Sequence, residues 1–184
     1  MKRLIAFVVV AISMGAAAQM PDVQVKQNTP PEEEVPWQEL KDVKPPAFPR
    51  QETLREFYVG PVTTNSYFID ASTLTVGSDR VVRYVLVVVT SGGATNVTFE
   101  GINCEDRRWK LYATGRNDGT WANSRTARDE WRPIENKPVN RHHAALSRDL
   151  FCPGGVAIVT AEEGRNALRL GMHPNSLSSH TDVH

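Results

Sequence analysis

VVRYVLVVV, residues 81–89, is the strongest strand signal in this chain. Nearly all of its side chains are β-branched, aromatic or aliphatic, and such side chains fit a pleated surface and disfavour a helix. The odd and even positions are both mostly apolar, so we expect a central strand that is covered on two faces. The turn formers Ser91-Gly92-Gly93-Ala94 come next, followed by strand-like stretches at 95–104 and 109–113. The pattern predicts an antiparallel meander.

Shorter elements surround this meander. Strand-like stretches are expected at 54–59, 66–70 and 72–76, because each is apolar or β-branched and is bounded by turn residues. Helices are expected at 141–151 and at about 160–170. In the second of these, acidic residues come first, basic residues come later and Gly171 ends the pattern. The fold class is therefore α+β: an antiparallel meander sheet packed with one or two C-terminal helices.

The first 18 residues resemble a cleavable export signal. Met1-Lys2-Arg3 is basic, residues 4–12 are apolar, and Ala16-Ala17-Ala18 supplies the small residues of a cleavage site near Ala18. An uncleaved membrane anchor is the alternative, but the apolar run is shorter than the ~20 residues needed to span a bilayer. No cysteine lies near the cleavage site, so the chain is not expected to be a lipoprotein. We expect a periplasmic protein with no transmembrane span in its mature chain.

The mature chain divides into an arm, one domain and a tail. Residues 19–50 are rich in proline and contain Glu32-Glu33-Glu34, a composition typical of a partly disordered tether. Trp37, Leu40 and Phe48 are exceptions in this composition, and they can attach the later part of the arm to the domain surface. Residues 51–172 are expected to form a single α+β domain, and residues 173–184 a polar, flexible tail. The charges of the full chain balance, with 21 Lys plus Arg and 21 Asp plus Glu. That balance argues against nucleic-acid binding.

The chain has two cysteines, Cys104 and Cys152. In an exported chain, a disulfide between them is the expected state. It would close a loop worth about 4 kcal/mol in the chain-entropy model. A catalytic or metal-binding thiol pair is the alternative, but the wide spacing and the lack of Cys-x-x-Cys disfavour it.

Several stretches together resemble the cryptic neisserial protein family, a family of uncharacterised exported proteins of Gram-negative bacteria. The stretches are Val82-Arg83-Tyr84, residues 96–104, residues 110–113, Trp121, residues 131–134 and residues 150–152. The glycine-isoleucine-x-cysteine piece that ends at Cys104 is the most specific of them. The resemblance implies a location in the cell envelope and two cysteines at matching places, and it implies no activity.

Arg83 and Glu100 are candidate binding residues on neighbouring strands of the meander. If the two strands pair about the turn at 91–94, residue numbers that sum to about 185 lie opposite each other. Arg83 and Glu100 are then diagonal neighbours, and a cross-strand ion pair between them is expected. The alternative is a polar pocket floor in which a buried carboxylate titrates unusually.

Trp121 and Trp131 are the other candidate ligand-binding residues, because exposed aromatic rings can stack on sugars, although most tryptophans in a small domain belong to the core. His142-His143 suggests a metal site, but metal ligands on a helix normally sit at i and i+4, where this chain has Leu146 and Ser147. We therefore predict no metal site, no cofactor and no catalytic residue.

Three function classes remain open. The first and favoured class is a non-enzymatic exported protein that binds an envelope protein or glycan through one sheet face or the Trp121–Trp131 region. The second is a hydrolase-type enzyme on a cell-envelope substrate, with Glu100 or the histidines as acid–base groups. The third is an assembly accessory that acts through its N-terminal arm.

Overall fold

The structure is a computed structural model that describes residues 36–123, 130–138 and 140–176. The predicted signal peptide (1–18), most of the predicted arm and the end of the predicted tail, with His180 and His184, lie outside the described residues. One compact unit begins at Trp37, so it includes the last part of the predicted arm.

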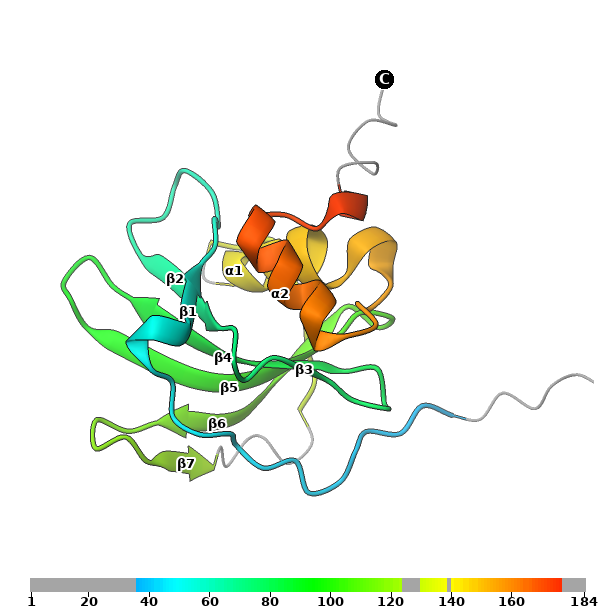
Figure 1. The fold of residues 1–184 in the computed structure, drawn as a ribbon, viewed down its shortest axis with the longest axis horizontal. Helices are drawn as coiled ribbons and strands as arrows, with labels where there is room; N and C mark the ends of the chain where they lie inside the picture. The colour runs from blue at the N-terminus through cyan, green and yellow to red at the C-terminus, as the bar shows by residue number, and fades with distance from the viewer. Residues whose placement is uncertain (1–35, 124–129, 139, 177–184) are drawn as a thin grey trace, which may run out of the picture. The chain divides into compact units, whose positions relative to one another are not determined.

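An antiparallel sheet is the centre of this unit (Figure 1). Within the described residues it has eight strands: β1 (Leu54–Glu56), β2 (Ser66–Asp70), β3 (Thr75–Val76), β4 (Val82–Val89), β5 (Thr95–Asn103), β6 (Arg108–Gly115), β7 (Trp121–Asn123) and β8 (Arg132–Pro133). The main path runs β1-β2-β4-β5-β6-β7, while β3 pairs with β4 and β8 with β6. The α+β class and the antiparallel meander are thereby confirmed. Two short strands, β7 and β8, lie in a region that the sequence pattern indicates as irregular.

The turn of the central hairpin fixes the register of β4 and β5. The turn has five residues, 90–94, because the N–H of Thr90 donates to the carbonyl of Ala94. Gly93 takes a φ of 82° in this turn, a conformation that suits glycine. Paired residue numbers therefore sum to 184, with Tyr84 opposite Glu100. This register differs by one from the predicted value of 185.

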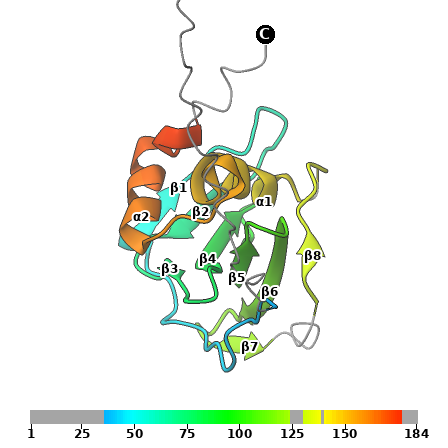
Figure 2. The same ribbon diagram turned by 90° about the vertical axis from the view of Figure 1, so that its right-hand side faces the viewer.

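Helical segments cover one face of the sheet (Figures 1 and 2). They are α1 (Arg141–Ala145), a π-helical turn (Leu146–Phe151), α2 (Ala161–Leu170) and short 3-10 turns at Pro153–Gly155 and Pro174–Ser176. The Thr160 hydroxyl caps α2 by accepting from the N–H of Glu163 at 3.1 Å, and Gly171 ends the helix at a φ of 79°. Both predicted helices are present, the first with a π-helical second half. None of the helices in the described part of the chain has the length and hydropathy that a bilayer-spanning helix needs.

The alternating side chains of β4 enter two different cores. Val82, Tyr84 and Leu86 join the larger core, which lies between the sheet and the helices. Val85 and Val87 join a smaller core on the opposite face, with Phe99 and Ala113. This arrangement confirms that β4 is a central strand covered on both faces.

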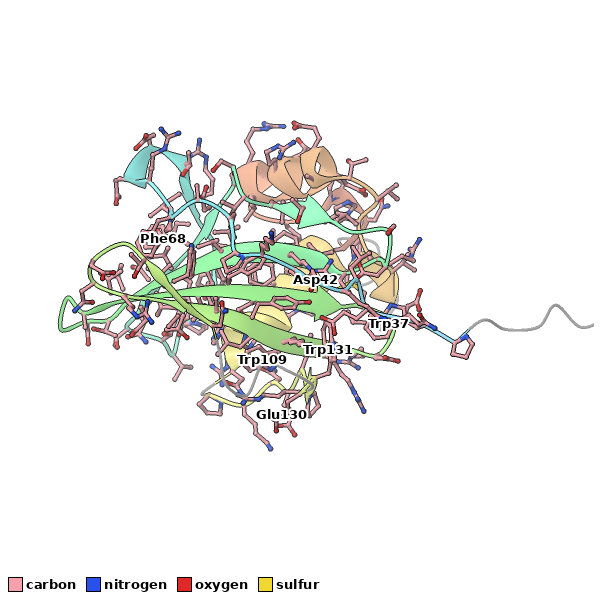
Figure 3. All side chains as sticks on the ribbon, turned by 90° about the horizontal axis from the view of Figure 1, so that it is seen from below. Trp37, Asp42, Phe68, Trp109, Glu130 and Trp131 are labelled. Atoms are coloured by element: carbon pink, nitrogen blue, oxygen red, sulfur yellow. A yellow bond between two sulfur atoms is a disulfide. The ribbon has the colours of Figure 1, made fainter. Side chains whose placement is uncertain are left out.

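The second face is covered by residues 37–50, which we call the covering segment. It has no regular secondary structure and crosses the sheet on the side opposite the helices (Figures 1 and 3). Its Val43 packs on the smaller core, and its Phe48 lies 5.3 Å from the ring of Trp121. A segment with this many prolines loses little conformational entropy when it lies extended on a surface.

The disulfide between Cys104 and Cys152 is present, as predicted, with a Cα–Cα distance of 5.5 Å. It links the residue after β5 to the residue after the π-helical turn, and so joins the sheet to the helical layer. The folded unit also extends beyond residue 172. His173 donates its backbone N–H to the carbonyl of Asp149, and the Ser176 hydroxyl donates to the carbonyl of Arg148.

Candidate functional site

Arg83 and Glu100 lie on opposite faces of the sheet. The register of 184 places Arg83 opposite Gly101 and Glu100 opposite Tyr84, so the two side chains point in opposite directions. The predicted ion pair between Arg83 and Glu100 is therefore wrong. A shift of one residue moves a whole strand's side chains to the other face, and the five-residue turn causes that shift here.

Arg83 pairs instead with Asp79 on the face of the covering segment. Its two terminal nitrogens donate to the two carboxylate oxygens of Asp79, at 3.0 and 2.5 Å, and both side chains are buried. Burial raises the pKa of Asp79, but the Arg83 guanidinium and the N–H of Leu40 lower it more, so the pKa lies below its ordinary value. Asp79 also binds the covering segment directly: it accepts from Leu40 N–H, and its carbonyl accepts from Trp37 Nε1.

Trp131 and Trp121 hold the covering segment as well. Nε1 of Trp131 donates to Glu39 at 3.1 Å, and its ring meets Trp37 edge to face (Figure 3). Nε1 of Trp121 donates to the carbonyl of Pro46 at 2.9 Å. The indole N–H of each predicted ligand-binding tryptophan is thus used inside the molecule.

Glu39 is the main polar contact of this segment. Its carboxylate accepts from Lys110 Nζ and Tyr112 Oη, both at 2.8 Å, as well as from Trp131 Nε1. The Lys110 side chain is only 7% exposed, so the ion pair is largely shielded from water. The sequence does not indicate the role of Glu39, because its three partners lie more than 70 positions away in the chain.

On the helix face, Glu100 forms a buried polar cluster. Nε2 of His143 donates to Glu100 at 2.9 Å, and the Tyr84 and Thr98 hydroxyls donate at 3.2 and 2.8 Å. Burial raises the pKa of Glu100, but the interactions with His143, and smaller ones with His142 and Thr98, lower it more. Burial together with the Glu100 charge raises the pKa of Tyr84 well above its ordinary value, which keeps this phenol a neutral donor.

This cluster has the composition of an acid–base pair but no access to a substrate. Glu100 is 3% and His143 1% exposed, and neither residue lines any of the three hollows described below. The ring of His143 is covered by Trp109, which stacks on it at a centroid distance of 3.8 Å. The predicted polar pocket floor is therefore a buried core contact. General acid–base catalysis requires a donor within reach of a bound substrate, and this arrangement gives none.

His142 lies between this cluster and Tyr67. Its ring lies 4.0 Å from that of His143 and stacks on Tyr67 at 5.3 Å. Burial and the neighbouring His143 lower the pKa of His142 to about 4, so it is neutral at pH 7. Among the described residues no group of three or more His, Cys, Asp or Glu side chains is arranged to hold a metal ion.

Tyr67 lies between two hollows, about 360 and 450 Å³ in volume, which we call the loop site. The site is built by the loop that joins β1 to β2, which rises beside α1 (Figures 1 and 2). The first hollow is lined by Val59, Val62, Thr63, Thr64, Asn65, Tyr67, Pro138 and Arg141. The second is lined by Glu56, Phe57, Tyr58, Val59, Gly60, Thr63, Asn65, Tyr67 and Gly171.

The sequence does not indicate the loop site, because residues 54–59 have the pattern of a single strand. The strand ends at Glu56, since only Leu54–Glu56 pairs with β2 and the chain then opens into the loop. Gly60 takes a φ of 125°, a conformation open to glycine, and a Cβ at this position would contact the Arg141 side chain. In the sequence, Gly60-Pro61 is the sign of this loop, but it indicates only the end of a strand and not a binding site.

A third hollow, of about 390 Å³, lies beside the disulfide and includes Arg107, Asn136 and Arg148 in its lining. Arg148 already binds Asp149 through two hydrogen bonds of 2.6 Å. One of the two basic groups of this hollow is therefore neutralised by a neighbour.

Comparison with known proteins assigns a family and no activity. No curated protein and no solved structure matches this chain. The model of the CNP1-like family matches residues 32–169, which contain every described strand, the disulfide and nearly all of α2. That match covers well over half of the 184 residues and confirms the resemblance, so the chain belongs to the CNP1-like family.

Proposed function

We propose that this protein is an exported, periplasmic binding protein without enzymatic activity, and that it binds an envelope component at the loop site. The observation that carries the proposal is the exposure of two apolar side chains at that site. Tyr58 is 72% and Val62 76% exposed, on a loop that also forms two adjoining hollows. Exposed apolar side chains around a hollow that holds a few polar groups are typical of binding sites.

The two faces of the sheet are less suitable for a ligand. One face carries the helical layer and the other the covering segment, and Trp121 and Trp131 donate their indole N–H groups to that segment. A ligand on either face would have to displace part of the protein. The proposed site is therefore at the loop, away from the two tryptophans.

The hydrolase alternative rests on Glu100 and His143, which do form a hydrogen-bonded pair. Their burial supports a structural role, because an ionised carboxylate inside a core needs donors to offset its desolvation. The assembly alternative rests on the N-terminal arm. Its described part, residues 36–50, uses Glu39 and Trp37 to bind its own domain.

A thermal-shift screen of the mature, oxidised protein tests the proposal. The probes are soluble peptidoglycan fragments, lipopolysaccharide and vesicles of anionic phospholipid. A bound component raises the Tm by mass action. We expect this increase to be lost in Tyr58→Ala and Val62→Ser and retained in Val159→Ser, a control at an equally exposed valine that lines neither hollow of the loop site.

Two results would contradict the proposal. An increase in Tm that is the same in all three variants would place binding elsewhere. Release of soluble fragments from purified cell walls by the wild-type protein, lost in Glu100→Gln, would show an enzyme. Location is tested separately: protein from a periplasmic extract should begin at Gln19 by N-terminal sequencing, and a chain that begins at Met1 would contradict the export signal.

A further inference from the structure

Arg141 lines the first hollow of the loop site and has no acidic partner there. Its Nε is buried and has no hydrogen-bond partner, and the guanidinium forms no ion pair with any residue in the described part of the chain. A half-buried guanidinium normally binds a carboxylate or a carbonyl oxygen, because an unpaired buried donor is costly. Arg141 therefore has unused capacity to bind an anion.

The charges around Arg141 favour an anionic ligand. No Asp or Glu lines the first hollow among the described residues, and its other polar groups include the Thr63 hydroxyl and the Asn65 amide. The neighbouring His142 stacks on Tyr67 and is neutral at pH 7. A carboxylate in this hollow would meet one cation and neutral donors.

The rest of the loop site is apolar. Val59 and Tyr67 line both hollows, Val62 and Pro138 line the first, and Phe57 and Tyr58 line the second. The second hollow contains one carboxylate, Glu56, which would repel a second negative charge there. A ligand that fits both hollows thus has a single anionic end and an uncharged apolar body.

We propose that the loop site binds the carboxylate of a small apolar molecule, with the carboxylate on Arg141 and the apolar part against Tyr58 and Val59. This inference rests on the proposed function, because it names the ligand chemistry of the same site. An apolar carboxylate can come from an acyl chain or from the C-terminal residue of a peptide. The two sources share the chemistry and differ in the shape of the apolar part.

Isothermal titration of the mature, oxidised protein with matched pairs of probes tests the inference. Octanoate and octanamide represent an acyl chain, N-acetyl-phenylalanine and its amide represent a peptide end, and inorganic phosphate represents an anion without an apolar part. We expect at least one carboxylate to bind about tenfold or more tightly than its amide, since charge-assisted bonds to a guanidinium exceed neutral ones. The carboxylate that binds more tightly identifies the source.

Variants assign the interaction to its residues. Arg141→Gln should weaken carboxylate binding about tenfold or more and leave amide binding nearly unchanged. Arg141→Lys keeps the charge without the planar fork and should give an intermediate loss. Tyr58→Ser should weaken both members of a pair equally, and Arg165→Gln, at an exposed ion pair on α2, should change neither. Circular dichroism and Tm confirm that each variant is folded.

The possible failures of the inference and of the proposed function differ. Equal binding of acid and amide, unchanged carboxylate binding in Arg141→Gln, or phosphate binding as tight as that of the best carboxylate would overturn the ligand chemistry. If no carboxylate binds at millimolar concentration while an envelope component still raises the Tm through Tyr58, the inference is wrong and the proposed function stands. If the carboxylate binds but Tyr58→Ser and Arg141→Gln have no effect, it binds outside the loop site and the inference is wrong. Both proposals are wrong if, in addition, Tyr58→Ala keeps the increase in Tm that an envelope component causes.

Discussion

Removal of the Glu39 carboxylate should detach the covering segment and destabilise the whole domain. Glu39→Ala leaves Lys110 without its anion at a side chain that is only 7% exposed, and it removes the acceptor of Tyr112 and Trp131. Loss of one partner of a buried pair costs about 3–5 kcal/mol. Because Glu39 is itself 20% exposed, we expect about 3 kcal/mol, a large part of the ~5–15 kcal/mol that stabilises a typical domain.

Urea unfolding, followed by tryptophan fluorescence, measures this loss. With a typical m-value of about 1–3 kcal/mol/M, a loss of about 3 kcal/mol lowers the midpoint by about 1 M or more. Glu39→Gln retains an acceptor oxygen and should lose about half as much. A double-mutant cycle with Lys110→Met should give a coupling energy of about 1–2 kcal/mol.

The matched control is Glu52→Gln, because Glu52 forms an exposed ion pair with Arg50 at 3.3 Å. An exposed pair contributes less than about 1 kcal/mol, so the midpoint should hardly change. If Glu39→Ala and Glu52→Gln have the same midpoint, the covering segment does not stabilise the sheet, and the second core is not a part of the cooperative unit.

Three further predictions concern pH, the turn before β4 and the disulfide. Since the folded pKa of His142 is about 4 and lies below its unfolded value, the unfolded state binds the extra proton, and stability should fall as pH falls from about 6.5 toward 4. Urea unfolding should show a loss of about 2 kcal/mol in the free energy of unfolding between pH 7 and 4.5. His142→Phe keeps an aromatic ring without a titratable group and should not show this loss. If the free energy of unfolding changes with pH equally in both proteins, His142 is not the cause. Gly77→Ala places a Cβ against Oδ1 of Asp79 and should lower the Tm by several degrees, whereas Gly92→Ala, in an open turn, should not; equal Tm values would contradict the close packing. Reduction of the disulfide should cost up to about 4 kcal/mol in urea unfolding, and two reactive thiols in unreduced, denatured protein would show that the bond does not form.

The elements with strong local signals were predictable. Residues 81–89 are apolar on both faces, and the structure places them between two cores. The second helix has a capping Thr160 and a terminal Gly171, so its ends are set by neighbouring residues. The cysteine pairing follows from there being only two cysteines in the chain.

The contacts that depend on distant residues were not predictable. The hairpin register depends on whether the turn has four or five residues. With four residues Arg83 would lie on the same face as Glu100, whereas with five it lies on the other face and pairs with Asp79. Trp37 and Phe48 indicated that the later part of the arm can attach to the domain, and both contact it. The sequence did not indicate Glu39 or its partners, because Lys110 and the others lie far along the chain. The Glu100–His143 contact likewise joins a strand to a helix 43 residues later.

The two covers of the sheet differ in how they are attached, and this difference sets which of them opens more often. A covalent bond joins the helical layer to the residue that follows β5, whereas side-chain contacts and hydrogen bonds alone hold residues 37–50. Local opening under native conditions should therefore free the covering segment more often than the helical layer and briefly expose Val85, Val87 and Phe99 to water, although both covers are lost in the same global unfolding transition. Molecules that are open in this way present a flat apolar β-surface to one another, so the rate of self-association under native conditions should follow the local opening of the covering segment.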